Sequence, residues 1–203
     1  MTKVKVCGIT NMEDAVIASS LGANFLGFNF YPKSPRFLNK KKVKEIIETL
    51  PRNVKSVGIF VNENIKEVKD TINFCKIGLV QLSGDESESY VKKLRGAIKQ
   101  KIIKCFHIRN PAMPDFSYYT ADYIMLDSFK KGFYGGTGKS FNWKIAENIN
   151  SKKLFLSGGL NVNNVKEAIQ KLKPYAVDVC SSVELYQGKK DFEKMRAFIE
   201  AVK

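Results

Sequence analysis

The sequence of 203 residues predicts an α/β protein, a single-domain (β/α)8 or TIM barrel that spans residues 1–203. Two observations lead to this fold class. Short apolar runs rich in β-forming residues alternate with segments whose apolar residues recur three or four positions apart. Eight such runs are present, and right-handed crossovers between parallel strands leave few ways to arrange them. An open, doubly wound sheet is the alternative, but no G-x-G-x-x-G motif follows the first run.

The predicted strands are short, and several are apolar throughout, which is typical of strands buried on both faces of a parallel sheet. The first, Lys3–Cys7, comes directly after the N-terminus, which therefore reads as a strand and not as a signal peptide. In chain order the others are Phe25–Phe30, Lys55–Phe60, Gly78–Gln81, Ile102–Phe106, Tyr123–Leu126, Leu154–Leu156 and Val177–Val179.

The predicted helices lie between these strands. The first, Glu13–Leu21, begins after Thr10 and Asn11, whose side chains can cap a helix. The segment Asn110–Asp115 contains two prolines and disfavours a long helix, so we expect the fifth connection to be short or irregular. The other helices, each with apolar residues at helical spacing, are Lys40–Leu50, Ile65–Phe74, Glu86–Ile98, Trp143–Ile149, Val165–Leu172 and Phe192–Val202.

Composition narrows the function classes. No apolar run approaches the roughly 20 residues that a membrane span needs. The net charge is +14, but the lysines are spread over predicted helices and form no dense basic arm interleaved with aromatic residues, so we expect no nucleic-acid partner. The four cysteines are widely separated and there is one histidine, which argues against disulfides and a zinc site. We therefore expect a cytoplasmic protein.

Two segments near the C-terminus suggest a site for an anion. Leu154–Leu160 and Ala176–Glu184 each run from an apolar strand into small residues and then toward a helix-like segment. Backbone N–H groups in such loops, together with the positive end of a helix dipole, bind phosphate. The pair of loops therefore predicts a phosphorylated small-molecule substrate.

The ends of the predicted strands supply the candidate catalytic groups, because the active sites of such barrels lie at the carboxyl ends of the strands. Cys7 ends the first strand, Asp127 ends the sixth, Asp178 lies in the eighth and Arg36 follows the second. A thiol and a carboxyl group that face each other can act as general base and general acid. The alternatives are a small buried cysteine at position 7 and a turn-forming aspartate at position 127.

Two further features have open interpretations. The segment Tyr134–Lys139 lacks the spacing of a P-loop, and its glycines fit either the hinges of a loop over the site or a simple connection. His107 follows the fifth strand and is a surface residue or a functional one. Gln81 ends the fourth strand.

The order of these motifs resembles the phosphoribosylanthranilate isomerase family. The resemblance runs from about residue 3 to residue 200, and the combination of the opening Cys-Gly-Ile-Thr with the later loops makes it specific. The matching segments are Lys5–Asn11, Gly27–Arg36, Val57–Asn62, Val80–Leu82, Leu126–Ser128, Tyr134–Lys139, Leu156–Leu160 and Val177–Val179.

The resemblance implies an Amadori rearrangement of N-(5-phosphoribosyl)anthranilate in tryptophan biosynthesis, with no cofactor and no metal. Asp127 would be the general acid that opens the sugar ring, and Cys7 the base that removes the C2 proton. Arg36 would bind the anthranilate carboxylate, and Asp178 the sugar hydroxyls or the anilino nitrogen. The phosphate would lie on the loops that contain Gly158, Gly159, Ser181 and Ser182. Cys7 must then be partly ionised, while Asp127 must hold a proton near neutrality.

Three positions depart from the family pattern. Ser83 stands where the family has histidine, and Asn142 where it has aspartate. After the eighth strand the family has Ser-Ser-Gly, whereas this chain has Cys180-Ser181-Ser182. The Cβ of Ser182 is expected to crowd the phosphate or to disfavour a positive φ, so phosphate binding is expected to be weaker at worst.

Two other functions compete with this one. An isomerase of the histidine-pathway type, acting on another phosphorylated sugar, should carry an aspartate where Cys7 stands. A barrel that only binds a phosphorylated ligand is supported by the altered loop after the eighth strand alone. The sequence leaves the oligomeric state open between monomer and homodimer.

Overall fold

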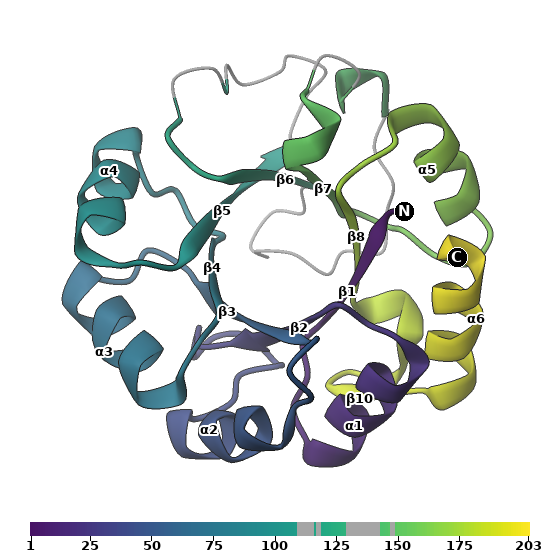
Figure 1. The fold of residues 1–203 in the computed structure, drawn as a ribbon, viewed down its shortest axis with the longest axis horizontal. Coiled ribbons are helices and arrows are strands. Elements are labelled where there is room, and N and C mark those ends of the chain that lie inside the picture. The colour runs from purple at the N-terminus through teal and green to yellow at the C-terminus, as the bar shows by residue number, and fades with distance from the viewer. Residues whose placement is uncertain (109–115, 117–118, 129–142, 147–148) are drawn as a thin grey trace.

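The computed structural model describes residues 1–108, 116, 119–128, 143–146 and 149–203. Eight parallel strands pair in chain order and close into a barrel, because the first strand pairs with both the second and the eighth. The strands form a ring with the helices on its outside (Figure 1). The predicted (β/α)8 barrel is therefore confirmed.

All eight predicted strands are present, with bounds that differ from the predictions by up to two residues. The fifth is the longest of the eight and extends beyond its predicted run at both ends, because Lys101 pairs with the fourth strand and its last residues pair with the sixth. The strands are β1 (Lys3–Cys7), β2 (Phe25–Asn29), β3 (Lys55–Phe60), β4 (Leu79–Leu82), β5 (Lys101–Ile108), β6 (Tyr123–Ser128), β7 (Leu154–Leu156) and β8 (Ala176–Val179).

Six α-helices cover the described part of the barrel, and side-chain caps define where most of them begin. The side chains of Asn11, Asn39, Asn64, Ser87 and Asp191 each accept a hydrogen bond from the backbone N–H three residues on. Within the described residues no helix is long and apolar enough to cross a membrane. The helices are α1 (Met12–Leu21), α2 (Lys40–Thr49), α3 (Ile65–Cys75), α4 (Glu88–Ala97), α5 (Val165–Leu172) and α6 (Phe192–Val202).

Two regions differ from the predictions or lie beyond the described part of the chain. The predicted helix Trp143–Ile149 is wrong as an α-helix over its described part, which is a 3-10 helix, η1 (Trp143–Ala146). A second 3-10 helix, η2 (Ser151–Lys153), precedes β7. The prolines of Asn110–Asp115, and with them most of the fifth connection, lie outside the described residues.

A small hairpin after β8 was not predicted. A 3-10 helix, η3 (Ser181–Val183), leads into β9 (Glu184–Tyr186) and β10 (Lys189–Lys190). Asp14 of α1 holds this hairpin in place, because its carboxylate accepts bonds from Lys190 N and Lys189 Nζ, both at 2.8 Å. Strands of two and three residues give too short a pattern to be recognised in the sequence.

The apolar core has two layers that follow the alternation of side chains along the strands. The inner layer fills the barrel itself, and Phe155 lies within it, in ring contact with Phe25 at 5.4 Å and with Tyr123 at 5.2 Å. The outer layer packs strands against helices. The inner layer leaves the carboxyl ends of the strands to polar side chains.

We expect Phe155→Ala to lower the free energy of unfolding by about 3–5 kcal/mol, because it opens a cavity inside the barrel. Urea unfolding followed by circular dichroism measures this loss. Phe74→Ala is the matched control: Phe74 is 44% exposed, and its removal should cost about 1 kcal/mol or less. Equal losses in the two variants would contradict the assignment of Phe155 to the core.

Candidate active site

The carboxyl ends of β1, β6 and β8 bring three of the predicted residues to one end of the barrel. Cys7 is the last residue of β1, Asp127 lies next to the last residue of β6, and Asp178 lies in β8. In the closed ring β1 adjoins β8, and β7 lies between β8 and β6. Cys7 and Asp127 are therefore three strands apart around this end of the barrel. Any electrostatic link between them depends on the side chains that lie between them.

A continuous polar network joins these strand ends. Lys5 Nζ donates to Asp178 Oδ1 at 2.7 Å, and Asp178 Oδ2 lies 3.2 Å from Ser157 Oγ. The same hydroxyl lies 3.4 Å from Asp127 Oδ1, so Ser157 can donate to either carboxylate. Sequence reasoning missed both Lys5 and Ser157. Lys5 was read as part of a strand, and Ser157 as part of a phosphate loop.

Lys5 is fully buried and contacts two site residues at once. Burial alone would lower the pKa of this amine, but the Asp178 carboxylate, and then a hydrogen bond to Cys7, raise it above its ordinary value. Lys5 is therefore a permanent cation beneath Cys7. The signal in the sequence was a lysine between two apolar residues in a strand that must be buried on both faces.

Cys7 does not stand alone, because its thiol is hydrogen-bonded to Cys180. This bond, together with burial, raises the pKa of Cys7 well above its usual range, although Lys5 opposes the change. The same bond, assisted by the cations Lys190 and Arg36 against burial, lowers the pKa of Cys180 to about 7. Cys180 therefore ionises more readily than Cys7, where we expected the thiolate.

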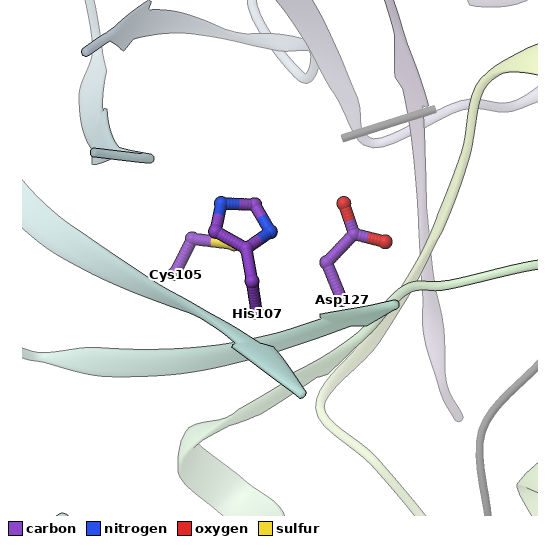
Figure 2. Close-up of side chains that lie close together, drawn as sticks. All are labelled: Cys105, His107 and Asp127. Carbon is purple, nitrogen blue, oxygen red and sulfur yellow. The ribbon is translucent and has the colours of Figure 1, made fainter. Parts of the chain in front are cut away.

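Asp127 is 6% exposed and lies beside His107, its register partner on β5. Burial raises the pKa of Asp127 to about 6, His107 lowers it, and Asp178 raises it further. Figure 2 shows the imidazole and the carboxyl group side by side at neighbouring strand ends. The His107 Nε2 atom lies 2.9 Å from the carbonyl oxygen of Ser83, which fixes the orientation of the ring. His107 is therefore part of the site and not a surface residue.

Among the described residues, one group has donor atoms close enough together to hold a metal ion. Cys105, His107 and Asp127 offer a sulfur, a nitrogen and an oxygen that all lie within 4.8 Å of one another (Figure 2). These are ligand types that Zn²⁺ accepts. No step of the reaction considered below passes through a metal at this position.

Arg36 reaches the mouth from the loop after β2 and is held there by Glu184. Its Nε and Nη2 atoms donate to the two carboxylate oxygens at 2.7 and 2.6 Å, and Arg36 as a whole is 8% exposed. Burial raises the pKa of Glu184, but the bonds from Arg36 and Lys190 lower it below its ordinary value. Sequence reasoning missed Glu184. A Cβ at Gly8 would collide with Arg36 Cδ, so a glycine is needed there for the arginine to pass.

The two predicted phosphate loops lie next to each other and are tied by a hydrogen bond. Gly158 and Gly159 have φ of 83° and 69°, values that favour glycine. Ser182 Oγ donates to Leu160 O at 2.6 Å, which links the loop after β8 to the loop after β7. Ser182 is not among the described residues of positive φ, so the strain expected from replacing a glycine there does not arise.

Three further predicted features concern the segment after β8, Gln81 and the segment Tyr134–Lys139. The loop after β8 leads through the 3-10 turn Ser181–Val183 and the hairpin to α6, whose bounds are those predicted. Gln81 is buried at the end of β4 and donates from Nε2 to Ser83 Oγ at 2.9 Å. The segment Tyr134–Lys139 lies outside the described residues.

The fold and the site together define a class of protein: a (β/α)8 barrel that carries a thiol and a carboxyl group at the carboxyl ends of its strands. The family model for N-(5'-phosphoribosyl)anthranilate (PRA) isomerase matches residues 4–201. This chain belongs to the phosphoribosylanthranilate isomerase family.

Individual relatives agree with this assignment. The isomerase of that name from Trichlorobacter lovleyi is 45% identical over 206 aligned positions, which cover 100% of this chain and 98% of the relative. The crystal structure of the Thermus thermophilus enzyme superposes with a TM-score of 0.90 at 32% identity, covering 99% of this chain and 98% of that one. A third structure, with a TM-score of 0.84 at 33% identity, covers 100% and 98% of the two chains and contains reduced 1-(o-carboxyphenylamino)-1-deoxyribulose 5-phosphate.

We expect His107→Asn to raise the pKa of Asp127 above about 6, because the imidazole is the group that lowers it most. Titration of the Asp127 carboxyl carbon by NMR measures the shift in each protein. Ser157→Ala is a useful comparison, since the loss of its weaker hydrogen bond should change the same pKa in the same direction but less. An unchanged pKa in His107→Asn would contradict the electrostatic role of the imidazole.

Proposed function

We propose that this protein catalyses the Amadori rearrangement of N-(5-phosphoribosyl)anthranilate to 1-(2-carboxyphenylamino)-1-deoxyribulose 5-phosphate, the activity for which its family is named. One observation carries the proposal for the site: a thiol and a carboxyl group at the barrel mouth are joined through Lys5, Asp178 and Ser157. Such a network allows a base and an acid to act on two parts of one substrate.

Asp127 acts first, as the general acid. It donates its proton to the furanose ring oxygen, the bond from C1 to that oxygen breaks, and the nitrogen lone pair forms the C1=N bond of a Schiff base. A carboxyl group with a pKa of about 6 keeps a useful protonated fraction near neutrality, which an ordinary exposed aspartate does not. Burial is the main cause, so the barrel mouth itself supports this role.

Cys7 then acts as the base. Its sulfur takes the C2 proton, the C–H electron pair forms the C1=C2 bond, and the C1=N pair returns to nitrogen. The enolamine tautomerises to the ketone. Lys5 favours the ionised form of Cys7 by its charge and its hydrogen bond, although Cys180 ionises more readily. Movement of the shared proton from Cys7 to Cys180 would release the base when substrate arrives.

The remaining predicted residues bind the substrate. Arg36 takes the anthranilate carboxylate through the part of its guanidinium that Glu184 leaves open, and Glu184 fixes its direction. Gly158, Gly159, Ser181 and Ser182 take the phosphate on two loops that the Ser182–Leu160 bond holds together. Asp178 addresses the sugar hydroxyls or the anilino nitrogen. The relative that contains a reduced product analogue supports a phosphorylated ligand in this class of site.

We also infer that the protein works in the cytoplasm, as a monomer or a homodimer. All four cysteines are free, as expected in a reducing compartment.

We expect Cys7→Ala and Asp127→Ala to lower kcat by about 10²–10⁴-fold while the barrel still folds, because each change removes one proton-transfer group. The assay follows the loss of anthranilate-type fluorescence while phosphoribosylanthranilate is generated in situ, corrected for its spontaneous breakdown. Cys75→Ala is the control, since that thiol is buried against Lys40 O. Wild-type turnover in either site variant would overturn its role. No turnover in the wild type, with phosphate ligand bound, would favour a binding protein.

We expect Arg36→Lys to raise KM about tenfold or more with a smaller change in kcat. A lysine keeps the charge but loses the planar fork that can bind Glu184 and a carboxylate together. Steady-state kinetics on both proteins separate the two constants. A large fall in kcat at unchanged KM would instead place Arg36 in the chemical step.

A further inference from the structure

We infer that Cys7 and Cys180 form a redox-sensitive pair that peroxide closes to a disulfide, reversibly switching the enzyme off. The inference rests on the proposed function in one respect: the loss of activity depends on Cys7 being the base. The bridge itself depends only on the geometry and charge of the two thiols.

The adjoining ends of β1 and β8 bring the two cysteines together. β1 and β8 pair in parallel with Lys5 opposite Asp178 and Val6 opposite Val179. Lys5 and Asp178 meet by their side chains, whereas both valines belong to the outer core between strands and helices. Cys7 is the last residue of β1 and Cys180 directly follows β8, so the two thiols lie at adjoining strand ends, with Cys180 Sγ 3.2 Å from where a Cβ on Gly8 would stand.

The spacing of such neighbours suits a disulfide. Adjacent strands lie about 4.8 Å apart, and disulfides form between residues whose Cα atoms are roughly 4.4–6.8 Å apart. The two thiols are close enough for each to shift the pKa of the other. Gly8 leaves room for the second thiol, because a Cβ there would lie 3.2 Å from Cys180 Sγ. The bridge therefore needs no large movement of either strand.

Cations around Cys180 make it the reactive member of the pair. Lys190 Nζ lies 3.9 Å from Cys180 Sγ and 3.2 Å from its carbonyl oxygen, and Arg36 also favours the thiolate. Glu184 opposes them, but its carboxylate is engaged by both cations. Thiolates are the form that attacks peroxide, so Cys180 should react first.

Exposure separates this pair from the other two cysteines. Cys7 and Cys180 are both partly exposed, whereas Cys75 and Cys105 are buried. Burial also raises the pKa of Cys75 and of Cys105, which keeps both as unreactive thiols. A small oxidant that enters the barrel mouth therefore meets only the pair.

Hydrogen peroxide can oxidise the two thiols to a disulfide in two steps. The Cys180 thiolate attacks one peroxide oxygen, the O–O bond breaks, and the leaving hydroxide is protonated to water, which gives a sulfenic acid. The sulfur of Cys7 then attacks the Cys180 sulfur, the S–O bond breaks, and a second water leaves. The two sulfurs lose two electrons, which reduce one peroxide to two waters. Cys7 can then no longer accept a proton until a dithiol reduces the bridge.

Cys180 is also a departure from the family pattern, which has serine at this position. A serine cannot form the bridge, so Cys180→Ser is a variant matched in size and polarity. It need not keep full activity, because each protein is compared with its own activity before treatment.

The experiment treats the reduced full-length protein with equimolar hydrogen peroxide and then measures three quantities. We expect peptide mapping to find a Cys7–Cys180 bridge, the free thiols to fall by two, and the turnover rate to fall about a hundredfold or more. Dithiothreitol should remove the bridge and restore both the free thiols and the turnover rate. In Cys180→Ser no bridge can form and the loss of activity should be slower, because the more reactive thiol is absent. Cys75→Ser should behave as the wild type.

The outcomes separate this inference from the proposed function. Absence of the bridge in an active wild-type protein, or equally fast reversible inactivation of Cys180→Ser, overturns the redox pair and leaves the isomerase intact. If the bridge forms but the reduced wild-type protein shows no isomerase activity, the redox pair is supported and the catalytic role of Cys7 is contradicted.

Discussion

The ion pair between Lys5 and Asp178 is the contact around which the barrel mouth is arranged. Both side chains are buried, and either charge would be costly there without the other. The pair also crosses the seam where the first and last strands close the barrel. The same contact therefore links the first strand to the last and places a cation under Cys7. Asp178 is in turn within hydrogen-bonding distance of Ser157, which also lies next to Asp127.

Opposite electrostatic surroundings act on the two ends of this network. Asp127 is buried beside Asp178, and these effects outweigh His107, so its pKa rises. At the other end Lys5, Arg36 and Lys190 gather positive charge around two thiols. A carboxyl group with a raised pKa, beside a thiol pair in which one member has a lowered pKa, suits general acid and base catalysis near neutral pH. The high net charge of the chain is consistent with this, although most of its lysines lie elsewhere.

Much of the site could be predicted from the sequence. Cys7, Asp127 and Asp178 were found because strand ends can be read from short apolar runs, and Arg36 because it follows one of them. Glu184 could not be found, since its bond to Arg36 joins residues 148 positions apart and passes through an unpredicted hairpin. The backbone strain expected at Ser182 was wrong, because its φ is not one that needs glycine, and its hydroxyl donates to Leu160 O of the neighbouring loop.

The local pattern of the chain determined the order of strands and helices, because alternation, helical spacing and capping residues act over a few positions. That order, with right-handed crossovers, was enough to predict the closed barrel. Which side chains meet at the mouth depends on the register between strands far apart in the sequence. Lys5 meets Asp178 across 173 positions, and no local pattern contains that distance. The pKa values of Cys7, Cys180 and Asp127 depend on these contacts, so only the folded barrel determines them.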